Sequence, residues 1–521
     1  MKNQDLLKLL HGLRKGVGRA LTIGLSDDVV LAFLSKDTKL AQAITGAVER
    51  KAELEKEFHD LFKLDEMDLK VQLQSGILNF YPESSISPYV PIYAKGPWII
   101  TAYGAVVYDT GGYGMLGLGH YPDEVFKAVA TPQVMANVMT PSFSQRRIVS
   151  KLKESIGHTR SHCPYDQFVF MNSGSEAMSV ATRIVDINAK TMTDPDGLHA
   201  GKKIMLLGLE RAFHGRTDRP AQVSDSTLGK CQIMASFRDR KNLITVPVND
   251  IKALEAAFMK VEQENIFIEA CFMEPVLGEG SPGLALQPEF YRRARELTTK
   301  YNSILIIDSI QAALRAHGVL SIVDYPGFSD EKAPDMESFS KALNAAQFPL
   351  SVLAIRKEIA EIYKPGVYGN TMTANPRALD VACAVLDQMD KGLRSNIVDA
   401  GREFLHKLKD LKDEFPETIT KVVGTGLLLS AEIDLKIPVA SKGGLEELIR
   451  KAGVNVIHGG KNALRFTPHF AMNSQEIDLV ISLVRKAIQE FKAPEVDVKL
   501  NEMHKPRSFV SVLKGLFSTL F

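Results

Sequence analysis

Asp308 and Lys341 are residues of opposite charge in apolar surroundings, and together they could do chemistry. Asp308 follows the apolar run "SILII", which is typical of a strand buried on both faces. Lys341 lies in "PDMESFSKAL" and precedes a run with little charge. A lysine in an apolar pocket loses its proton readily and can then form a Schiff base with a carbonyl. A solvated strand end and a surface lysine are the simpler interpretations of each residue alone, but a buried Asp308 would need a cation to face.

A third stretch, "FVFMNSGSEAMSVATR", could bind an anion. Its pattern predicts a strand that runs into Ser173, Gly174 and Ser175 and then a helix. Free backbone N–H groups, hydroxyl donors and the positive end of the helix dipole would favour a phosphate there. The alternative is an ordinary capped helix start with Ser175 as the N-cap residue.

Two further stretches carry aromatic, basic and acidic side chains directly after predicted strands. In "ERAFHGRTDRP", Phe213 and His214 could form an aromatic wall, and Arg216 could hold a carboxylate. In "MEPVLGEGSPG", Glu274 and Glu279 flank a glycine-rich turn. Taken alone, an exposed turn and solvated acids are the simpler interpretations.

Together, these stretches supply what pyridoxal phosphate needs. The helix start would hold the phosphate, and Lys341 would form the Schiff base with the cofactor. Asp308 would face the pyridine nitrogen and keep it protonated, so that the ring can accept electrons from a substrate carbanion. Gln311, three residues further on, would hydrogen-bond the phenolic oxygen of the ring.

The elements that must position these residues alternate between strands and helices. Short apolar runs predict strands at 166–174, 202–210, 242–250, 266–275 and 303–309, with helical patterns between them. This spacing predicts an α/β fold with a mostly parallel sheet flanked by helices. Ligands of such sheets bind beyond the carboxyl ends of the strands, which is where the candidate residues stand.

The chain is expected to divide into four parts. Residues 1–75 form a helical extension, and residues 76–375 form a large α/β domain. Within it, residues 76–150 contribute partly to the small domain and to a dimer interface. Residues 376–495 form a smaller α+β domain, and residues 496–521 form an amphipathic tail.

Composition narrows the class of protein and its location. The 521 residues suffice for two or three domains, and the net charge of +1 gives no electrostatic reason to expect a nucleic-acid partner. No apolar run is long enough for stable insertion in a bilayer. The four cysteines have neither metal-ligand nor disulfide-framework spacing, so no metal site is predicted and a reducing compartment fits best. We expect a cytoplasmic protein, and the mitochondrial matrix stays open.

Eight motifs in order resemble one family across roughly residues 95 to 490. They are "GAVVYDTGGYGMLGLGHYPDEV", "NSGSEA", "FHGRT", "EPVLGEG", "DSIQ", "PDMESFSKAL", "GNTMTANP" and "LRFTPHF". The chain resembles the class III (ornithine/GABA-type) pyridoxal-phosphate aminotransferases of fold type I, whose large domain holds a seven-stranded-type sheet. Any one motif alone would not be specific, whereas eight in order are.

The resemblance implies roles for individual positions. Cofactor binding falls on Ser173, Gly174, Ser175, Phe213, His214, Asp308, Gln311, Lys341 and Thr371, of which Lys341 and Asp308 are catalytic. Phe213 would stack on the ring, and Thr371 of the partner subunit would reach the phosphate, so a homodimer with shared active sites is implied. Substrate binding falls on Tyr113, Arg216, Glu279 and Arg465. Arg465 would grip the α-carboxylate of glutamate or 2-oxoglutarate, and Glu279 would cover Arg465 when the other substrate has no carboxylate there.

Several positions depart from the family pattern. The usual D-E-[IV]-Q is "DSIQ" here, so Ser309 replaces the acid after the aspartate. Asn344 opens a run where small residues are usual, and Arg315 is shifted relative to the family arginine. His317 and Tyr368 also differ from the residues usual at their positions. These departures place the protein in a divergent branch and leave its substrate open.

The leading hypothesis is a transaminase that moves an amino group from an ω-amino acid or diamine-type donor to 2-oxoglutarate or another keto acid by a ping-pong mechanism. An aminomutase, racemase or decarboxylase on the same fold is the nearest alternative, because these enzymes differ in substrate pose and not in cofactor ligands. A non-catalytic binding or scaffold protein on a retired aminotransferase fold is an alternative of a different class.

Overall fold

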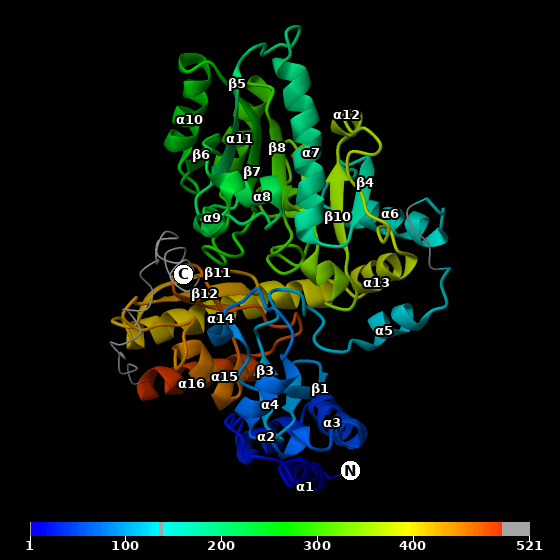
Figure 1. Cartoon of the computed structure of the whole chain (residues 1–521), viewed down its shortest axis with the longest axis vertical. Coiled ribbons are helices and arrows are strands. Elements are labelled where there is room, and N and C mark those ends of the chain that lie inside the picture. The colour runs from blue at the N-terminus through cyan, green and yellow to red at the C-terminus, as the bar shows by residue number, and fades with distance from the viewer. Residues whose placement is uncertain (1, 135–138, 492–521) are drawn as a thin grey trace, which may run out of the picture.

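A seven-stranded sheet lies at the centre of the upper part of the molecule (Figure 1). The computed structural model describes residues 2–134 and 139–491. The strand order is β4-β10-β9-β8-β7-β5-β6, and only β10 runs antiparallel to its two neighbours. The strands are β4 (Gln167–Met171), β5 (Lys203–Leu209), β6 (Leu243–Val246), β7 (Ile266–Met273), β8 (Ile304–Asp308), β9 (Met336–Phe339) and β10 (Ser351–Ile355). The predicted fold class, a mostly parallel sheet in an α/β protein, is confirmed.

Helices cover both faces of this sheet, which explains the continuous apolar runs of its strands. Along β8, Ile304 and Ile306 join the core under the long helix α7, whereas Leu305 and Ile307 join the core on the opposite face. α7 (Gly174–Thr193) lies on one face, and α10 (Ile251–Gln263) and α11 (Pro288–Lys300) lie on the other. The other helices along this part of the chain are α5 (Asp123–Ala130), α6 (Phe143–Ser155), α8 (Asp218–Gln222), α9 (Asp225–Cys231) and α12 (Lys357–Ala360).

The C-terminal part contains a second, antiparallel sheet with the order β11-β12-β15-β14. Its strands are β11 (Ile419–Thr425), β12 (Leu428–Ile433), β14 (Ile457–Gly459) and β15 (Ala463–Phe466). The helices of this part are α13 (Pro376–Asp387), α14 (Lys391–Glu414), α15 (Leu445–Ala452) and α16 (Ser474–Glu490). The smaller α+β arrangement predicted after residue 376 is therefore present, and β11 and β12 form a hairpin within it.

A third sheet joins segments that are far apart in the sequence. β1 (Pro91–Lys95), β2 (Trp98–Thr101) and β3 (Val106–Asp109) form an antiparallel meander, and β13 (Val454–Asn455) adds to β3 in parallel. Residues near 100 therefore pack with the C-terminal part. The exact domain boundaries 76–375 and 376–495 stay predictions, and the tail 496–521 lies outside the described residues.

Four helices precede the meander and pack against it (Figure 1). They are α1 (Asn3–Leu13), α2 (Asp27–Leu34), α3 (Thr38–Glu57) and α4 (Glu66–Leu73). The leucines of α1 at 6, 7, 10 and 13 are buried, so α1 docks on the body of the protein as an ordinary amphipathic helix. Within the two described ranges, no helix is both long and apolar enough to cross a membrane.

Asp37 connects the helical extension to the meander. Its carboxylate accepts a hydrogen bond from Lys39 N (2.8 Å) as the N-cap of α3 and another from Trp98 Nε1 (2.6 Å) on β2. Trp98 is fully buried, so its indole N–H depends on this partner.

Asp37→Ala should lower the free energy of unfolding by about 2–3 kcal/mol, because a helix cap and a buried hydrogen bond are lost together. Asp28→Ala is the matched control, since Asp28 is exposed in the first turn of α2, and it should cost less than about 1 kcal/mol. Urea unfolding, monitored by tryptophan fluorescence, measures the free energy of unfolding of both variants, because Trp98 is the one tryptophan of the chain. Equal effects of the two substitutions would contradict this role of Asp37.

Candidate active site

A cavity of about 430 Å³ lies at the edge of the large sheet where β4, β5, β7, β8 and β9 end. Its walls come from the segments that follow these strands, as expected for an open α/β sheet. The predicted residues on its walls are Ser173, Gly174, Ser175, Phe213, His214, Glu279, Asp308, Gln311 and Lys341. The structure therefore brings the sequence motifs together in one place.

The start of α7 forms the anion-binding side of the site. Ser173, and not Ser175, is the N-cap residue: its Oγ accepts a hydrogen bond from Glu176 N, and the Glu176 carboxylate accepts one from Ser173 N in return. Among the described residues, the backbone N–H groups of Gly174 and Ser175 have no protein acceptor. Two free N–H groups at the positive end of a 20-residue helix can bind a phosphate.

Asp308 is a buried carboxylate with three donors around it. Its Oδ2 atom lies 3.0 Å from Nδ1 of His214, and its Oδ1 atom accepts hydrogen bonds from Ser338 Oγ and Ile310 N, both at 3.1 Å. A carboxylate only accepts, so the Nδ1 atom of His214 carries the proton. His214 therefore orients Asp308, whereas the sequence had suggested an aromatic wall for it. Held in this way, Asp308 can face a cation from the cavity.

Lys341 is the second residue after β9, and it donates a hydrogen bond from Nζ to Gln311 Oε1. Burial, with the Arg465 charge nearby, lowers the pKa of Lys341 to about 8. A substantial fraction of the amine is therefore neutral near pH 7.5, as a nucleophile requires. The backbone of Lys341 has a φ of 46°, the left-handed region that is strained for a residue with a side chain.

Glu279 and Arg465 form a buried ion pair beside the cavity. Arg465 Nη1 lies 2.8 Å from Glu279 Oε2 and donates to Gly278 O at 2.7 Å. The Nε and Nη2 atoms of Arg465 have no partner in the described residues, although the side chain is only 1% exposed. Burial would raise the pKa of Glu279, but Arg465 and Lys341 hold it below its usual range. Glu279 lines the cavity and Arg465 does not, so the carboxylate covers the guanidinium.

Tyr113 lies on the other side of this ion pair. Its ring centroid is 4.9 Å from Arg465 Cζ, and its backbone carbonyl accepts a hydrogen bond from Gln311 Nε2 (3.1 Å). Tyr81 stacks on Tyr113 with the ring centroids 6.0 Å apart. The sequence analysis missed Tyr81, and the aromatic pair in "NFYP" before the meander was the available signal.

Arg216 is exposed and lies outside the cavity wall. Its guanidinium carbon is 5.5 Å from the ring centroid of Phe213 and 5.4 Å from that of Phe80, so it contacts both aromatic rings. Phe80 is a second residue of the "NFYP" stretch that the sequence analysis missed. A guanidinium placed there can meet the far end of a long substrate.

Glu274 is buried, so its interpretation as a solvated loop acid is wrong. Its carboxylate accepts hydrogen bonds from Phe213 N (2.8 Å) and Gly278 N (2.9 Å), and it thereby joins the two loops that carry Phe213 and Glu279. Burial raises the pKa of Glu274 to about 7, with Asp308 adding to the effect and His214 opposing it.

Thr371 lies on an exposed loop away from the cavity wall of its own chain. The neighbouring Asn370 ties this loop to the start of α7, since its Nδ2 atom donates to Glu176 Oε1 (2.7 Å) and its Oδ1 atom accepts from Asn172 Nδ2 (3.0 Å). A contribution of Thr371 to the site of a partner subunit stays a prediction.

The residues around the cavity fit pyridoxal phosphate. The free N–H groups at the start of α7 suit its phosphate, and an oriented buried carboxylate suits its pyridinium nitrogen. The flat face of Phe213 and the partly neutral amine of Lys341 lie on the same cavity wall.

Comparisons with known proteins agree with this assignment. The family profile described as "Aminotransferase class-III" matches residues 81–488. Ornithine aminotransferase 2 of Staphylococcus aureus is 27% identical over 423 residues, which cover 80% of this chain and 96% of that protein. Acetylornithine aminotransferase of Nostoc sp. is 26% identical over 331 residues, which cover 63% of this chain and 73% of that protein.

Solved structures show the same fold. The ornithine aminotransferase from Toxoplasma gondii ME49 superposes with a TM-score of 0.69 at 23% identity, over 84% of this chain and 98% of that one. A second structure of that enzyme was crystallized with oxidized glutathione and has partial occupancy of PLP at its active site. It superposes with a TM-score of 0.70 at 23% identity, over 84% of this chain and 97% of that one.

The lowered pKa of Lys341 makes the stability of the cofactor-free protein depend on pH. Between about 8 and the unfolded value of 10.5, the unfolded chain binds the proton that the folded protein has released, so stability rises with pH across this window. Lys341→Met should remove that rise and stabilise the cofactor-free protein at pH 7 by roughly 2–3 kcal/mol. Chemical denaturation from pH 7 to 11 measures the difference.

Lys357→Met is the control for this prediction, because Lys357 is exposed at the start of α12. Its pH dependence of stability should match that of the wild type. If the free energy of unfolding changed with pH in the same way for wild type and Lys341→Met, Lys341 would not be desolvated as the structure describes.

Proposed function

Because the chain belongs to the class-III aminotransferase family, we propose that it moves an amino group from an ω-amino acid or diamine-type donor to 2-oxoglutarate or another keto acid by a ping-pong mechanism. The observation that carries this proposal is the ion pair of Glu279 and Arg465 on the cavity side of β15. The two relatives above, an ornithine and an acetylornithine aminotransferase, support a donor with an amine at the end of its chain.

One site has to accept two substrates with different charge. A donor that presents a terminal amine brings no carboxylate to Arg465, and the Glu279 carboxylate then pairs with the guanidinium. An unpaired buried charge would be costly. When a dicarboxylate arrives, rotation of the Glu279 side chain exposes Arg465, whose Nε and Nη2 atoms are still free to bind. Arg465 can then hold a carboxylate in a two-point hydrogen bond.

Pyridoxal phosphate, the cofactor of this family, supplies an electron sink for the substrate carbon that loses its proton. The start of α7 would bind its phosphate through Gly174 and Ser175, and Phe213 would pack on its ring. Asp308, oriented by His214 and Ser338, would keep the ring nitrogen protonated.

Lys341 moves the proton in this proposal. Its neutral Nζ would take the proton from the substrate carbon that bears the amino group and deliver it to the cofactor carbon on the other side of the amine nitrogen. Hydrolysis by water would then release the keto product, with the amino group left on the cofactor. Gln311 holds Nζ through Oε1 and holds the Tyr113 carbonyl through Nε2, so it fixes the lysine relative to the substrate side of the cavity.

The proposal includes a homodimer. The loop around Thr371 is exposed, and Met372 on the same loop is 59% exposed although it is apolar. In a dimer, Thr371 of the partner subunit would complete the phosphate site.

Glutamate added to the reconstituted protein should remove the visible absorbance band of bound pyridoxal phosphate, because the amino group passes to the cofactor. Lys341→Ala should lose this reaction, since no amine remains to move the proton. Asp308→Asn should keep bound cofactor but react at least about 100-fold more slowly, because a neutral amide does not stabilise the pyridinium. Stopped-flow absorbance measures each rate.

A band that glutamate leaves unchanged in the wild type would favour an aminomutase, racemase or decarboxylase. A normal rate in Asp308→Asn would exclude the electron-sink role of Asp308.

Arg465→Ala should raise the KM for 2-oxoglutarate by about 30- to 100-fold, because a buried charge-assisted hydrogen bond is lost. Arg216→Ala should leave that KM within about threefold and instead raise the KM of long donors, since Arg216 lies outside the cavity wall. Steady-state kinetics with ornithine, N-acetylornithine and 4-aminobutyrate as donors distinguishes the KM effects of Arg465→Ala from those of Arg216→Ala. Arg465→Lys is the conservative control, and equal KM values for wild type and Arg465→Ala would refute the assignment.

A further inference from the structure

Glu337 is a fully buried acid on β9 that lies outside the cavity wall. Its two carboxylate oxygens accept four hydrogen bonds. Oε1 accepts from Ser309 Oγ (2.5 Å) and Ile322 N (2.9 Å), and Oε2 accepts from Tyr165 OH (2.8 Å) and Ser321 Oγ. Burial raises the pKa of Glu337, and the four hydrogen bonds to its carboxylate oppose that rise.

Three of these four donors lie at the two ends of one segment, residues 309–322. Ser309 opens the segment directly after β8, and Ser321 and Ile322 close it. A single carboxylate therefore holds both ends of a loop against the sheet.

The 309–322 segment carries two residues that connect the site to its surroundings. Gln311 bonds both Lys341 and the carbonyl of Tyr113, as described above. Arg315 is fully buried and donates to Gly114 O (3.2 Å), Leu427 O (3.1 Å) and Pro468 O (2.6 Å). The position of this segment thus decides where Gln311 lies relative to Lys341 and how the large sheet meets the C-terminal part.

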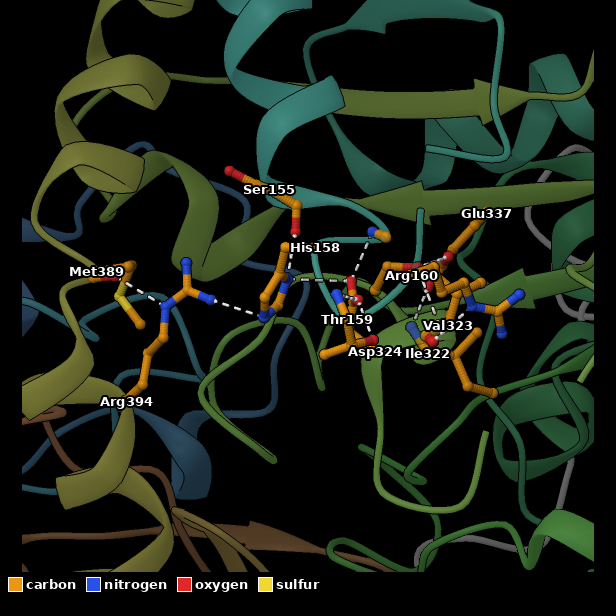
Figure 2. Close-up of polar contacts among 12 residues, drawn as sticks. Ser155, His158, Thr159, Arg160, Ile322, Val323, Asp324, Glu337, Met389 and Arg394 are labelled. Carbon is orange, nitrogen blue, oxygen red and sulfur yellow. Dashed lines mark hydrogen bonds and ion pairs between the residues drawn. The ribbon is translucent and has the colours of Figure 1, made fainter. Parts of the chain in front are cut away.

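The far end of the segment has a second anchor, shown in Figure 2. The Asp324 carboxylate accepts hydrogen bonds from Gly157 N (2.7 Å) and from the backbone and hydroxyl of Thr159 (3.0 and 2.7 Å). It lies 3.4 Å from His158 Nδ1, and His158 Nε2 lies 3.2 Å from Arg394 on α14. Ser309 is held differently: its side chain donates to Glu337, its backbone N–H donates to Ser338 O, and its carbonyl accepts a hydrogen bond from Ala313 N (2.8 Å).

Strand register brings Glu337 to Ser309. In the parallel pairing of β8 with β9, Ile307 is opposite Glu337. Side chains two residues apart on a strand share a face, so Ser309 and Glu337 are on the same face of the sheet. The Ser309 hydroxyl therefore donates its hydrogen bond to Glu337 from the neighbouring strand.

We propose that Glu337 is a positioning residue of this enzyme: it fixes the 309–322 segment so that Gln311 meets Lys341. This inference depends on the proposed function in one respect: the position of Gln311 affects the reaction rate only if Lys341 acts in transamination.

The test is a reciprocal exchange of the two side chains. Glu337→Ser removes the carboxylate, and the double variant Ser309→Glu with Glu337→Ser returns it from the other strand. Hydrogen exchange of the cofactor-free protein reports the 309–322 segment directly. Glu337→Ser should speed the exchange of its amides by about tenfold or more, and the double variant should restore most of the protection. Glu269→Gln is the control, because Glu269 is buried on β7 and pairs with Arg219 away from the segment.

The second readout is the rate of the glutamate reaction in the loaded enzyme. Glu337→Ser should lower it by about tenfold, the double variant should recover it, and Glu269→Gln should leave it within about threefold. Unchanged exchange in Glu337→Ser would overturn the inference, and so would a loosened segment with an unchanged rate or a double variant that restores neither. A wild type that does not react with glutamate would refute the proposed function instead, and the exchange measurement would still decide how the segment is held.

Discussion

The need to pair buried charges governs the structure around the cavity. Three ionisable side chains line the cavity at one edge of the large sheet, namely Lys341, Asp308 and Glu274. Burial there disfavours the ionised form of a side chain that has no hydrogen-bond partner. Each of these three side chains is hydrogen-bonded to a group that also holds a segment of the chain in place. His214 and Ser338 hold Asp308, Gln311 holds Lys341, and two loop N–H groups hold Glu274. The hydrogen bonds that make the charges tolerable therefore also set the geometry of the site.

The ion pair of Glu279 and Arg465 applies the same constraint to substrate exchange. Arg465 has to be buried to bind a carboxylate strongly, yet it must have a partner when no carboxylate is present. A carboxylate on a glycine-rich turn can serve as that partner and can move away. Tyr113 packs on the opposite face of the guanidinium and is itself backed by Tyr81. In the proposed function, the substrate side of the cavity combines the Glu279 carboxylate, which moves, with the aromatic pair of Tyr113 and Tyr81.

The four N-terminal helices add to the family core, and none of their residues lines the cavity. The family match begins at residue 81, after α4 has ended at Leu73. These helices cover the meander of β1, β2 and β3, and the bond between Asp37 and Trp98 joins the two. Because β13 pairs with β3, the extension also rests on the C-terminal part of the chain. The short stretch that follows α4 supplies Phe80 and Tyr81 to the substrate side of the site.

The sequence by itself determined the central strands and most of the site, because β5, β7 and β8 are buried on both faces and appear as apolar runs. It did not reveal β9 or β10 as strands, since β9 is four residues long and contains Glu337 in its middle. The family resemblance supplied the roles of Glu279 and Arg465, which no local pattern could connect across 186 positions. Only the tertiary structure decided that Glu274 is buried, that His214 bonds Asp308 and that Glu337 meets Ser309. Those three facts depend on strand register and on which loops share an edge of the sheet, and both are set by packing between distant segments.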